Sequence, residues 1–476
     1  MKSQQPLTLG MFGIGLDTYW PQFAGLKERL EGYQKQIAAI IESFGDVDLV
    51  DAGLVDNPER SRSVGSLFRQ KQVDAVFLYI STYALSSTVL PVAQATGVPI
   101  IVLNIQPVSR IDYESFNALG DRGTMTGEWL AHCQACCVPE IASVFRRAGI
   151  DYHLVTGYLG EPETEQAIGD WVSAARVART MRMNRLGVMG HYYAGMLDVY
   201  TDITRQVAAF GGHVDLIEID ELAELRAGVT EPEVEEKTAE FRREFEVSSE
   251  CDPEEITRAA ATSVALDKLV ATHQIGSLAY YYEGTSGSTH ENIVTSVIAG
   301  NTLLTGRNVP VAGECEIKNA QAMKIMDSFG AGGSFSELYA MDFDDDIVLL
   351  GHDGPAHFAI AEGKVGLVPL PVYHGKPGKG LSIQMTVKHG PVTLLSVCEG
   401  PEGVYMIVAE GESVPGPVLH IGNTNSRYRF SLSAREFVER WASLGPSHHC
   451  AIGVGHVAGK IEKFGKLTGI PVERVC

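Results

Sequence analysis

The sequence predicts an α/β protein: two doubly wound, Rossmann-like α/β domains followed by a C-terminal antiparallel β-rich, barrel-like domain. In the first half, short apolar runs alternate with amphipathic stretches, and this alternation restarts near residue 185. Strand–helix alternation indicates a parallel sheet with helices on both faces. After Gly332 the helical periodicity gives way to strand patterns. A length of 476 residues allows two to four domains, and we expect boundaries at 1–172, 173–330 and 331–476.

The first predicted domain begins with an apolar strand and an amphipathic helix. Residues 23–44 carry apolar side chains at helical spacing. Runs of apolar, β-branched residues predict its strands at 7–14, 47–53, 73–80, 99–105 and 151–159.

The second predicted domain repeats the same alternation. Its strands are expected at 185–191, 213–220, 275–282 and 309–314. Residues 218–268 are acidic and helix-forming, and we interpret their charges as the solvated face of helices.

The C-terminal domain is predicted from hairpin patterns. Residues 381–397 and 403–412 alternate as strands between Gly-Pro and His-Gly turns. One helix follows at 433–445, with Ser433 as its N-cap and Glu436 completing a capping box. We interpret Gly375–Gly380, GKPGKG, as a turn rather than a phosphate loop.

Composition narrows the functional classes. The net charge of −21 argues against nucleic acid or an anionic membrane as a partner. The N-terminal residues do not resemble a signal peptide, and apolar runs stay below the roughly 18 residues of a membrane span. The eight cysteines are scattered, which favours a reducing cytoplasm. Cys133, Cys136 and Cys137 are expected to pack within a helix rather than to bind zinc.

A dinucleotide site is only weakly indicated. Gly13-Ile14-Gly15 follows the first strand, but Thr18 occupies the place of the third glycine of the dinucleotide fingerprint. The second predicted strand supplies an acid at Asp51, yet without the full glycine loop we do not expect a dinucleotide cofactor.

Acidic side chains follow the predicted strand at 309–314. Glu314 and Glu316 are two residues apart, so they would share one face if the strand continued through them. Either a salt-bridged rim or a metal site would explain two carboxylates there.

Further ligand-type residues lie near later strand ends. Glu337 lies just inside a predicted strand, His352 ends the next strand, and His448 and His449 begin another. Carboxylate and imidazole ligands suit Mn²⁺, with Co²⁺ and Mg²⁺ as alternatives, while the lack of a cysteine quartet argues against structural zinc. Adjacent strand residues face opposite ways, so we expect at most one of the two histidines to be a ligand. Spacing alone does not show that these side chains converge.

These motifs resemble the L-arabinose isomerase and L-fucose isomerase superfamily. GECEIK matches the A-E-G-D-W-K motif, SFSELY the SFMEDY-like stretch, LLGHDG the third motif, and GPSHHC the G-G-x-H-H-T motif. The resemblance implies the metal ligands Glu314, Glu337, His352 and His449, with both glutamates also serving in acid–base catalysis. It implies a divalent-metal-dependent aldose–ketose isomerase that acts through a cis-enediol. Glu316 or Asp353 is a candidate for orienting the ligands.

The resemblance also implies a trimer-based, commonly hexameric, homo-oligomer with the active site at a subunit boundary. The chain departs from the arabinose enzymes at GIGLDTYW and FNALGDRGTM. The substrate therefore stays open among a pentose, a 6-deoxyhexose and a hexose with an acidic group at C6. Strand-end packing or a helix-start salt bridge would equally explain several of the candidate sugar contacts, which are Asp17, Tyr19, Trp20, Thr82, Arg122, Asn423, Asn425, Arg427 and His448.

Two other functions fit part of this pattern. Two α/β domains around a cleft would suit a non-catalytic sugar-binding protein, and a metal-dependent sugar epimerase would suit the same ligand set. Metal-dependent turnover excludes the first, and product analysis in heavy water separates the second.

Overall fold

The computed structural model describes residues 6–371 and 378–476. The chain divides into two compact units, Met1–Arg179 and Thr180–Cys476. The expected boundary at 172 falls inside one helix, α7 (Pro162–Met183). Gly375, Lys376 and Pro377 of GKPGKG lie outside the described residues.

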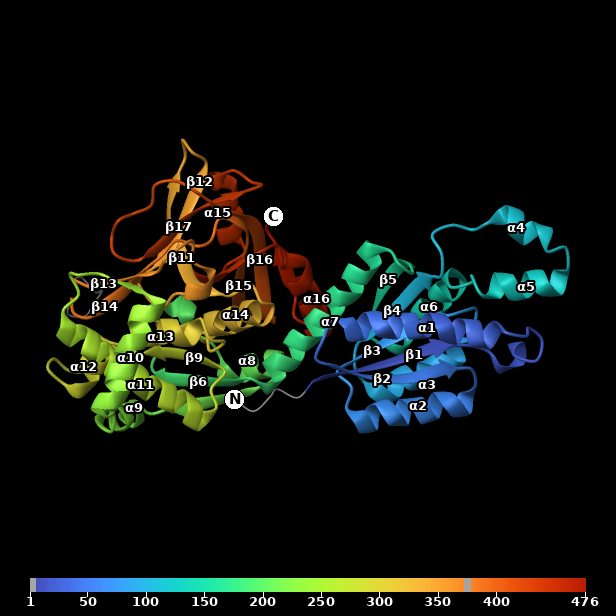
Figure 1. The fold of residues 1–476 in the computed structure, drawn as a ribbon, viewed down its shortest axis with the longest axis horizontal. Helices are drawn as coiled ribbons and strands as arrows, with labels where there is room; N and C mark the ends of the chain where they lie inside the picture. Colours follow the sequence, from blue (N-terminus) through green and yellow to red (C-terminus); the bar gives the residue numbers. More distant parts are fainter. Residues whose placement is uncertain (1–5, 372–377) are drawn as a thin grey trace. The chain divides into compact units, whose positions relative to one another are not determined.

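The first unit contains a five-stranded parallel sheet in the order β2-β1-β3-β4-β5 (Figure 1). This is a doubly wound strand order. Every residue of β3 is buried, as expected for a central parallel strand. All five predicted strands are confirmed: β1 (Leu7–Ile14), β2 (Val47–Val55), β3 (Ala75–Tyr79), β4 (Ile100–Gln106) and β5 (Tyr152–Tyr158).

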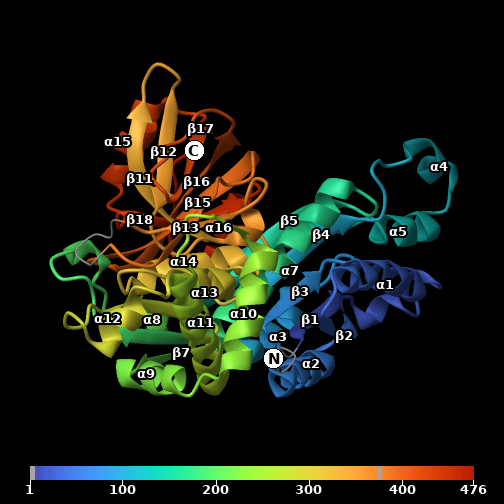
Figure 2. The ribbon, with the colours of Figure 1, turned by 60° about the vertical axis from the view of Figure 1, so that its left-hand side comes forward.

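Helices cover the sheet of the first unit. Apolar residues of α2, α3 and α6 share one core cluster with the strands, while Leu26 and Leu30 of α1 belong to a second cluster. In both ribbon views α4 and α5 project from the sheet (Figures 1 and 2). The helices are α1 (Leu26–Ser43), α2 (Pro58–Lys71), α3 (Ser86–Thr96), α4 (Tyr113–Ala118), α5 (Arg122–Leu130) and α6 (Val138–Ala148), with 3-10 turns η1 (Asp17–Tyr19) and η2 (Ala135–Cys137).

The prediction for the cysteine run is wrong in two respects. Helix α5 ends at Leu130, before the run, and Cys133 and Cys136 are joined by a disulfide. The chain turns after α5, which brings these two side chains together. Cys137 is buried and accepts a hydrogen bond from the Ala84 amide, so packing describes this residue alone.

The second unit begins with a four-stranded parallel sheet in the order β10-β9-β6-β7. Its strands are β6 (Arg185–Gly190), β7 (His213–Ile217), β9 (Ser277–Tyr281) and β10 (Val311–Ala312). Its helical elements are η3 (Leu197–Val199), α8 (Ile203–Phe210), α9 (Ile219–Ala227), α10 (Glu231–Glu244), α11 (Pro253–His273), α12 (Thr289–Val294), α13 (Ile298–Thr305) and α14 (Ile317–Ser328).

Six antiparallel strands close into the predicted barrel. They neighbour one another in the order β15-β18-β11-β12-β17-β16, and pairing of β15 with β16 completes the ring. Helix α14 contacts both the barrel and β9 of the parallel sheet (Figure 1). The barrel strands are β11 (Ser334–Asp342), β12 (Ile347–His352), β15 (Gly390–Gly400), β16 (Gly403–Val414), β17 (Thr424–Phe430) and β18 (His449–Val454).

Smaller elements surround the barrel. Strand β19 pairs with β16, and β8, β13 and β14 form a separate three-stranded sheet. Among the described residues, no helix is long and apolar enough to cross a bilayer. These elements are β8 (Glu246–Val247), η4 (Phe358–Ile360), β13 (Gly366–Pro369), β14 (Leu381–Gln384), α15 (Ala434–Ser443), α16 (Ala458–Thr468) and β19 (Val472–Arg474).

The predicted capping box at α15 is confirmed. The Ser433 hydroxyl accepts from the Glu436 amide, and the Glu436 carboxylate accepts from the Ser433 amide. Such a cap contributes about 1 kcal/mol. We expect Ser433→Ala to speed amide exchange in the first turn of α15 roughly fivefold, as measured by hydrogen exchange. Ser443→Ala, at the other end of the helix, is the matched control, and equal effects in both variants would contradict this account.

Candidate metal centre

Glu314 lies in a tight turn rather than on a strand. Strand β10 ends at Ala312, and both Glu314 and Cys315 adopt left-handed backbone conformations, with φ of 55° and 57°. The Cys315 amide donates to the Tyr280 carbonyl (2.9 Å), which fixes the turn against β9. Two consecutive non-glycine residues in this region are costly, and such backbone clusters at functional sites. The expectation that Glu314 and Glu316 share one strand face is therefore wrong, because the strand stops before either residue.

Barrel register explains how three other predicted ligands meet. Strand β11 pairs with β12 on one side and β18 on the other. Glu337 consequently lies opposite Gly351, next to His352, and also opposite His449. The ring of Phe335 packs on both histidines, with centroid distances of 4.3 Å to each. Side chains more than a hundred residues apart thus reach one end of the same three strands.

The potential ligand atoms form a cluster of two groups that share His449. Glu314, His352 and His449 each offer one donor atom within 4.8 Å of the others, and so do Glu337, His448 and His449. Nε2 of His449 lies 3.5 Å from Oε2 of Glu314. His448 precedes β18, so both histidines approach the cluster, and Nε2 of His448 lies 3.5 Å from Oε2 of Glu314. Each of the four expected ligands, and His448, therefore belongs to one of two groups that meet at His449.

Glu316 fixes the orientation of His449. It is the N-cap residue of α14, and its Oε2 accepts from Nδ1 of His449 at 2.5 Å. The two side chains are 1% and 0% exposed, and Nζ of Lys318 lies 3.6 Å from the other Glu316 oxygen. Burial alone would raise the pKa of Glu316, but the hydrogen bond from His449 and the positive charge of Lys318 hold it below its ordinary value.

Two atoms of the cluster are left without hydrogen bonds. Among the residues that the structure describes, neither Nε2 of His449 nor Oε2 of Glu314 has a hydrogen-bond partner, although both are buried. Buried polar atoms are rarely unpaired. Because Nδ1 of His449 donates to Glu316, Nε2 presents a lone pair, which is the arrangement of a metal-ligating histidine held by a carboxylate. The donor set therefore fits a divalent cation.

The ring of His352 is positioned by a backbone amide, whereas that of His449 is positioned by a carboxylate. Its Nδ1 accepts a hydrogen bond from the Gly354 amide at 2.8 Å. A Cβ built on Gly354 would lie 2.9 Å from that nitrogen, so glycine is needed for this close approach. Coordination through Nε2 would place the ring proton on Nδ1, and this hydrogen bond would then have to open.

Burial and neighbouring charges shift the pKa values of Glu337 and His448. Burial, with the charges of Glu314 and Asp353, raises the pKa of Glu337 against the opposing effect of the two histidines. Burial alone would lower the pKa of His448, but the carboxylates of Glu314, 3.5 Å from its Nε2, and of Asp198 raise it to about 9. In the metal-free protein, a carboxyl with a raised pKa thus lies beside a cationic imidazole.

The predicted sugar contacts Asn423 and Asn425 form hydrogen bonds within the protein. Asn423 donates to the Tyr339 hydroxyl (2.8 Å) and to Asp353 (2.6 Å), and thus lies beside the turn that follows His352. Asn425 exchanges hydrogen bonds with the Leu419 backbone. Both flank or belong to β17, so these two candidate contacts lie in or beside a largely buried strand.

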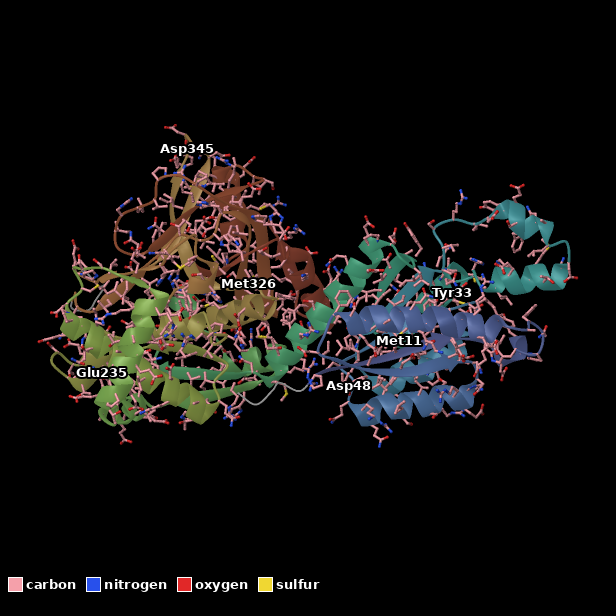
Figure 3. All side chains as sticks on the ribbon, viewed as in Figure 1. Met11, Tyr33, Asp48, Glu235, Met326 and Asp345 are labelled. Carbon is pink, nitrogen blue, oxygen red and sulfur yellow. A yellow bond between two sulfur atoms is a disulfide. The ribbon has the colours of Figure 1, made fainter. Side chains whose placement is uncertain are left out.

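Arg427 does not join the cluster. Its guanidinium pairs with Asp342 and Asp345 at the β11–β12 hairpin. Figure 3 shows Asp345 at the tip of that hairpin, well away from Met326 of α14.

Four of the predicted contacts in the first unit follow the ends of strands β1 and β3, and the fifth, Arg122, begins helix α5. Trp20 donates to Asp56 (2.8 Å), and its ring packs edge-on against Tyr19. The buried Thr82 donates to the Leu130 carbonyl (2.7 Å). Asp17 begins the 3-10 turn η1, and Arg122 is exposed in the first turn of α5.

Two polar residues beside the cluster were not predicted from the sequence. Asp198 accepts hydrogen bonds from His448, and Lys318 lies beside Glu316. Asp198 lies 250 residues from His448, in a loop without a distinctive motif. Lys318 is within GECEIK, where its position two residues after Glu316 was the available signal.

Comparison with known proteins identifies several relatives. No family model matches the chain. Sulfoquinovose isomerase from Alkalicoccus urumqiensis is 22% identical over 346 residues, covering 70% of this chain and 74% of that protein. L-arabinose isomerase from a Nocardioides species is 21% identical over 343 residues, covering 69% and 67%. L-arabinose isomerase from Bacillus subtilis is 21% identical over 356 residues, covering 70% and 68%.

Among solved structures, a periplasmic solute-binding protein from Actinobacillus succinogenes with bound D-allose covers 64% of this chain and 77% of its own, at 14% identity and a TM-score of 0.15. That score supports no conclusion. These curated relatives are sugar isomerases by name, and they support the arabinose isomerase-like superfamily for this chain.

Proposed function

We propose that the protein is a divalent-metal-dependent aldose–ketose isomerase that acts on a monosaccharide through a cis-enediol. One observation carries the proposal. Glu314, His352 and His449 form one group of potential ligands, Glu337 belongs to a second group that shares His449, and Nε2 of His449 and Oε2 of Glu314 are buried without hydrogen bonds in the described part of the chain. The four side chains are the proposed ligands, with Mn²⁺ as the proposed cation and Co²⁺ and Mg²⁺ as alternatives.

The chemistry requires a proton to move between C1 and C2, and another between O1 and O2. A divalent cation at this site would supply charge that stabilises the negative oxygens of the enediolate. Glu337, whose pKa is raised by burial, is the proposed group that takes the proton from one carbon and returns it to the other. Glu314 lies across the cluster and is proposed to serve the oxygen-bound proton.

The names of the relatives guide the substrate class. They act on L-arabinose, a pentose, and on sulfoquinovose, a hexose with an acidic group at C6. We propose that the substrate here is a pentose, a 6-deoxyhexose or a hexose with an acidic C6 group. A panel of aldoses and ketoses, incubated with Mn²⁺ and analysed by product chromatography, tests this.

The same panel tests the alternative functions. Turnover that stops with a chelator and returns with Mn²⁺ supports the isomerase, whereas binding without turnover supports a sugar-binding protein. An epimerase would invert a carbon without converting aldose to ketose, which product analysis in heavy water reveals.

We further propose a cytoplasmic, trimer-based assembly, commonly hexameric in this superfamily, in which the first domain of one subunit covers the metal of another. Asp17, Tyr19, Trp20, Thr82 and Arg122 would then contact sugar across that boundary. Sedimentation of the purified chain measures the assembly state.

Metal binding should stabilise the protein. With Mn²⁺ at about a hundred times its dissociation constant, linkage predicts roughly 2.7 kcal/mol of added stability. We expect a corresponding rise in the melting temperature of the metal-stripped protein. Glu314→Gln should lose most of this rise, and an undiminished rise in that variant would exclude Glu314 as a ligand.

A further inference from the structure

The loop that follows strand β6 of the parallel sheet contacts the cluster of potential ligands and is held there by hydrogen bonds. Residues 191–202 connect β6 to α8 and contain η3. The backbone carbonyl of Asp198 accepts hydrogen bonds from Nζ of Lys318 (2.7 Å) and from the Ser447 hydroxyl (3.3 Å). The Tyr193 amide donates to the Glu314 carbonyl (3.3 Å). The loop is thus hydrogen-bonded both to the turn that carries Glu314 and to Ser447, which lies just before β18.

The carboxylate of Asp198 holds His448 at two points. A single oxygen, Oδ2, accepts from the His448 backbone amide (3.0 Å) and from Nδ1 of its ring (2.6 Å). These two contacts fix both the backbone and the ring orientation. Nε2 then points into the cluster, 3.5 Å from Oε2 of Glu314 and 4.0 Å from Oε2 of Glu337.

His448 differs from its neighbour in accessibility. The side chain of His449 is fully buried, whereas that of His448 is 34% exposed. A histidine that is open to solvent, fixed by a carboxylate, and directed between two proposed acid–base residues is placed to contact an incoming molecule. A sugar hydroxyl near Glu314 and Glu337 would lie within reach of Nε2.

We propose that Asp198 is a positioning residue, which holds His448 so that its Nε2 hydrogen-bonds a hydroxyl of the sugar between Glu314 and Glu337. This inference rests on the proposed isomerase function. Asp198 acts only through His448 and does not itself touch the substrate. Misplacing such a contact by about 1 Å costs up to roughly a hundredfold in rate.

The test compares three variants of the whole chain, loaded with Mn²⁺ and assayed with the sugar that the panel identifies. Asp198→Ala should lower kcat/KM roughly tenfold to a hundredfold, while Mn²⁺ affinity changes less than twofold. Asp198→Asn should recover most of this loss, because one amide oxygen can accept both hydrogen bonds. Asp202→Asn is the matched control: it removes the same charge four residues away, and asparagine preserves the cap of α8.

A spectroscopic measurement separates positioning from a general structural defect. In protein labelled with ¹⁵N-histidine, the His448 ring signal, assigned through His448→Gln, should change in Asp198→Ala and not in Asp202→Asn. Wild-type kcat/KM in Asp198→Ala, an equal loss in Asp202→Asn, or a parallel loss of Mn²⁺ affinity would overturn the proposal. If the wild-type chain shows no metal-dependent turnover with any sugar, the proposed function itself fails.

Discussion

Glu337→Gln is expected to lower kcat by about 10²–10⁴-fold while leaving the fold intact, because the amide cannot accept and return a proton. Glu337 lies on β11 between the strands that carry His352 and His449, and its pKa is raised mainly by burial. Glutamine has nearly the same volume, so the barrel should tolerate the change. Initial rates at saturating sugar and Mn²⁺ measure the effect.

The matched control is Glu410→Gln. Glu410 is a partly buried glutamate on barrel strand β16, where it pairs with Arg474, outside the ligand cluster. It should retain wild-type turnover. A Glu337→Gln variant with bound Mn²⁺ and a near-native rate would assign the proton transfer to another group.

The second large effect is expected at Glu316. Glu316→Gln should weaken Mn²⁺ binding about 10–100-fold, because outer partners of ligating histidines typically contribute that much to affinity. The substitution removes the carboxylate that keeps the proton of His449 on Nδ1 and leaves Lys318 without its buried negative neighbour. Calorimetric titration of the metal-stripped protein with Mn²⁺ measures the change.

Glu240→Gln provides the control for losing a buried charge. Glu240 pairs with the buried Lys237 on α10, an arrangement similar to Glu316 and Lys318 but outside the cluster. Both variants should lose stability, and only Glu316→Gln should lose Mn²⁺ affinity. Equal affinities in the two variants would mean that Glu316 supports the fold alone.

Much of the fold could be predicted from local patterns. Apolar runs such as 75–79 become fully buried parallel strands, and Ser433 with Glu436 encodes a helix start that depends on four neighbouring residues. Such features are local, so a single sequence contains them. The prediction of a strand through Glu314 was wrong because the chain adopts a left-handed turn there, and no local sequence pattern predicted that turn.

The site was predictable in part. The sequence pattern placed ligand-type residues near strand ends. That they lie close together was expected only from the resemblance to a family, because the sequence of one strand does not determine its register with a distant strand. Asn425 and Arg427 lie on the buried strand β17, where the Asn425 amide donates to the Leu419 carbonyl and the Arg427 guanidinium pairs with Asp345. The contact of Asp198 with His448 and the disulfide between Cys133 and Cys136 were both missed, because each depends on the path of the backbone, which the local sequence does not determine.

The central claim is that one divalent cation is held by Glu314, Glu337, His352 and His449. Crystals soaked in MnCl₂ and measured at the manganese absorption edge test it directly. We expect one anomalous peak per chain, within coordination distance of both carboxylates and both imidazoles. Density that is empty among these four side chains, with manganese absent or bound elsewhere, would contradict the account.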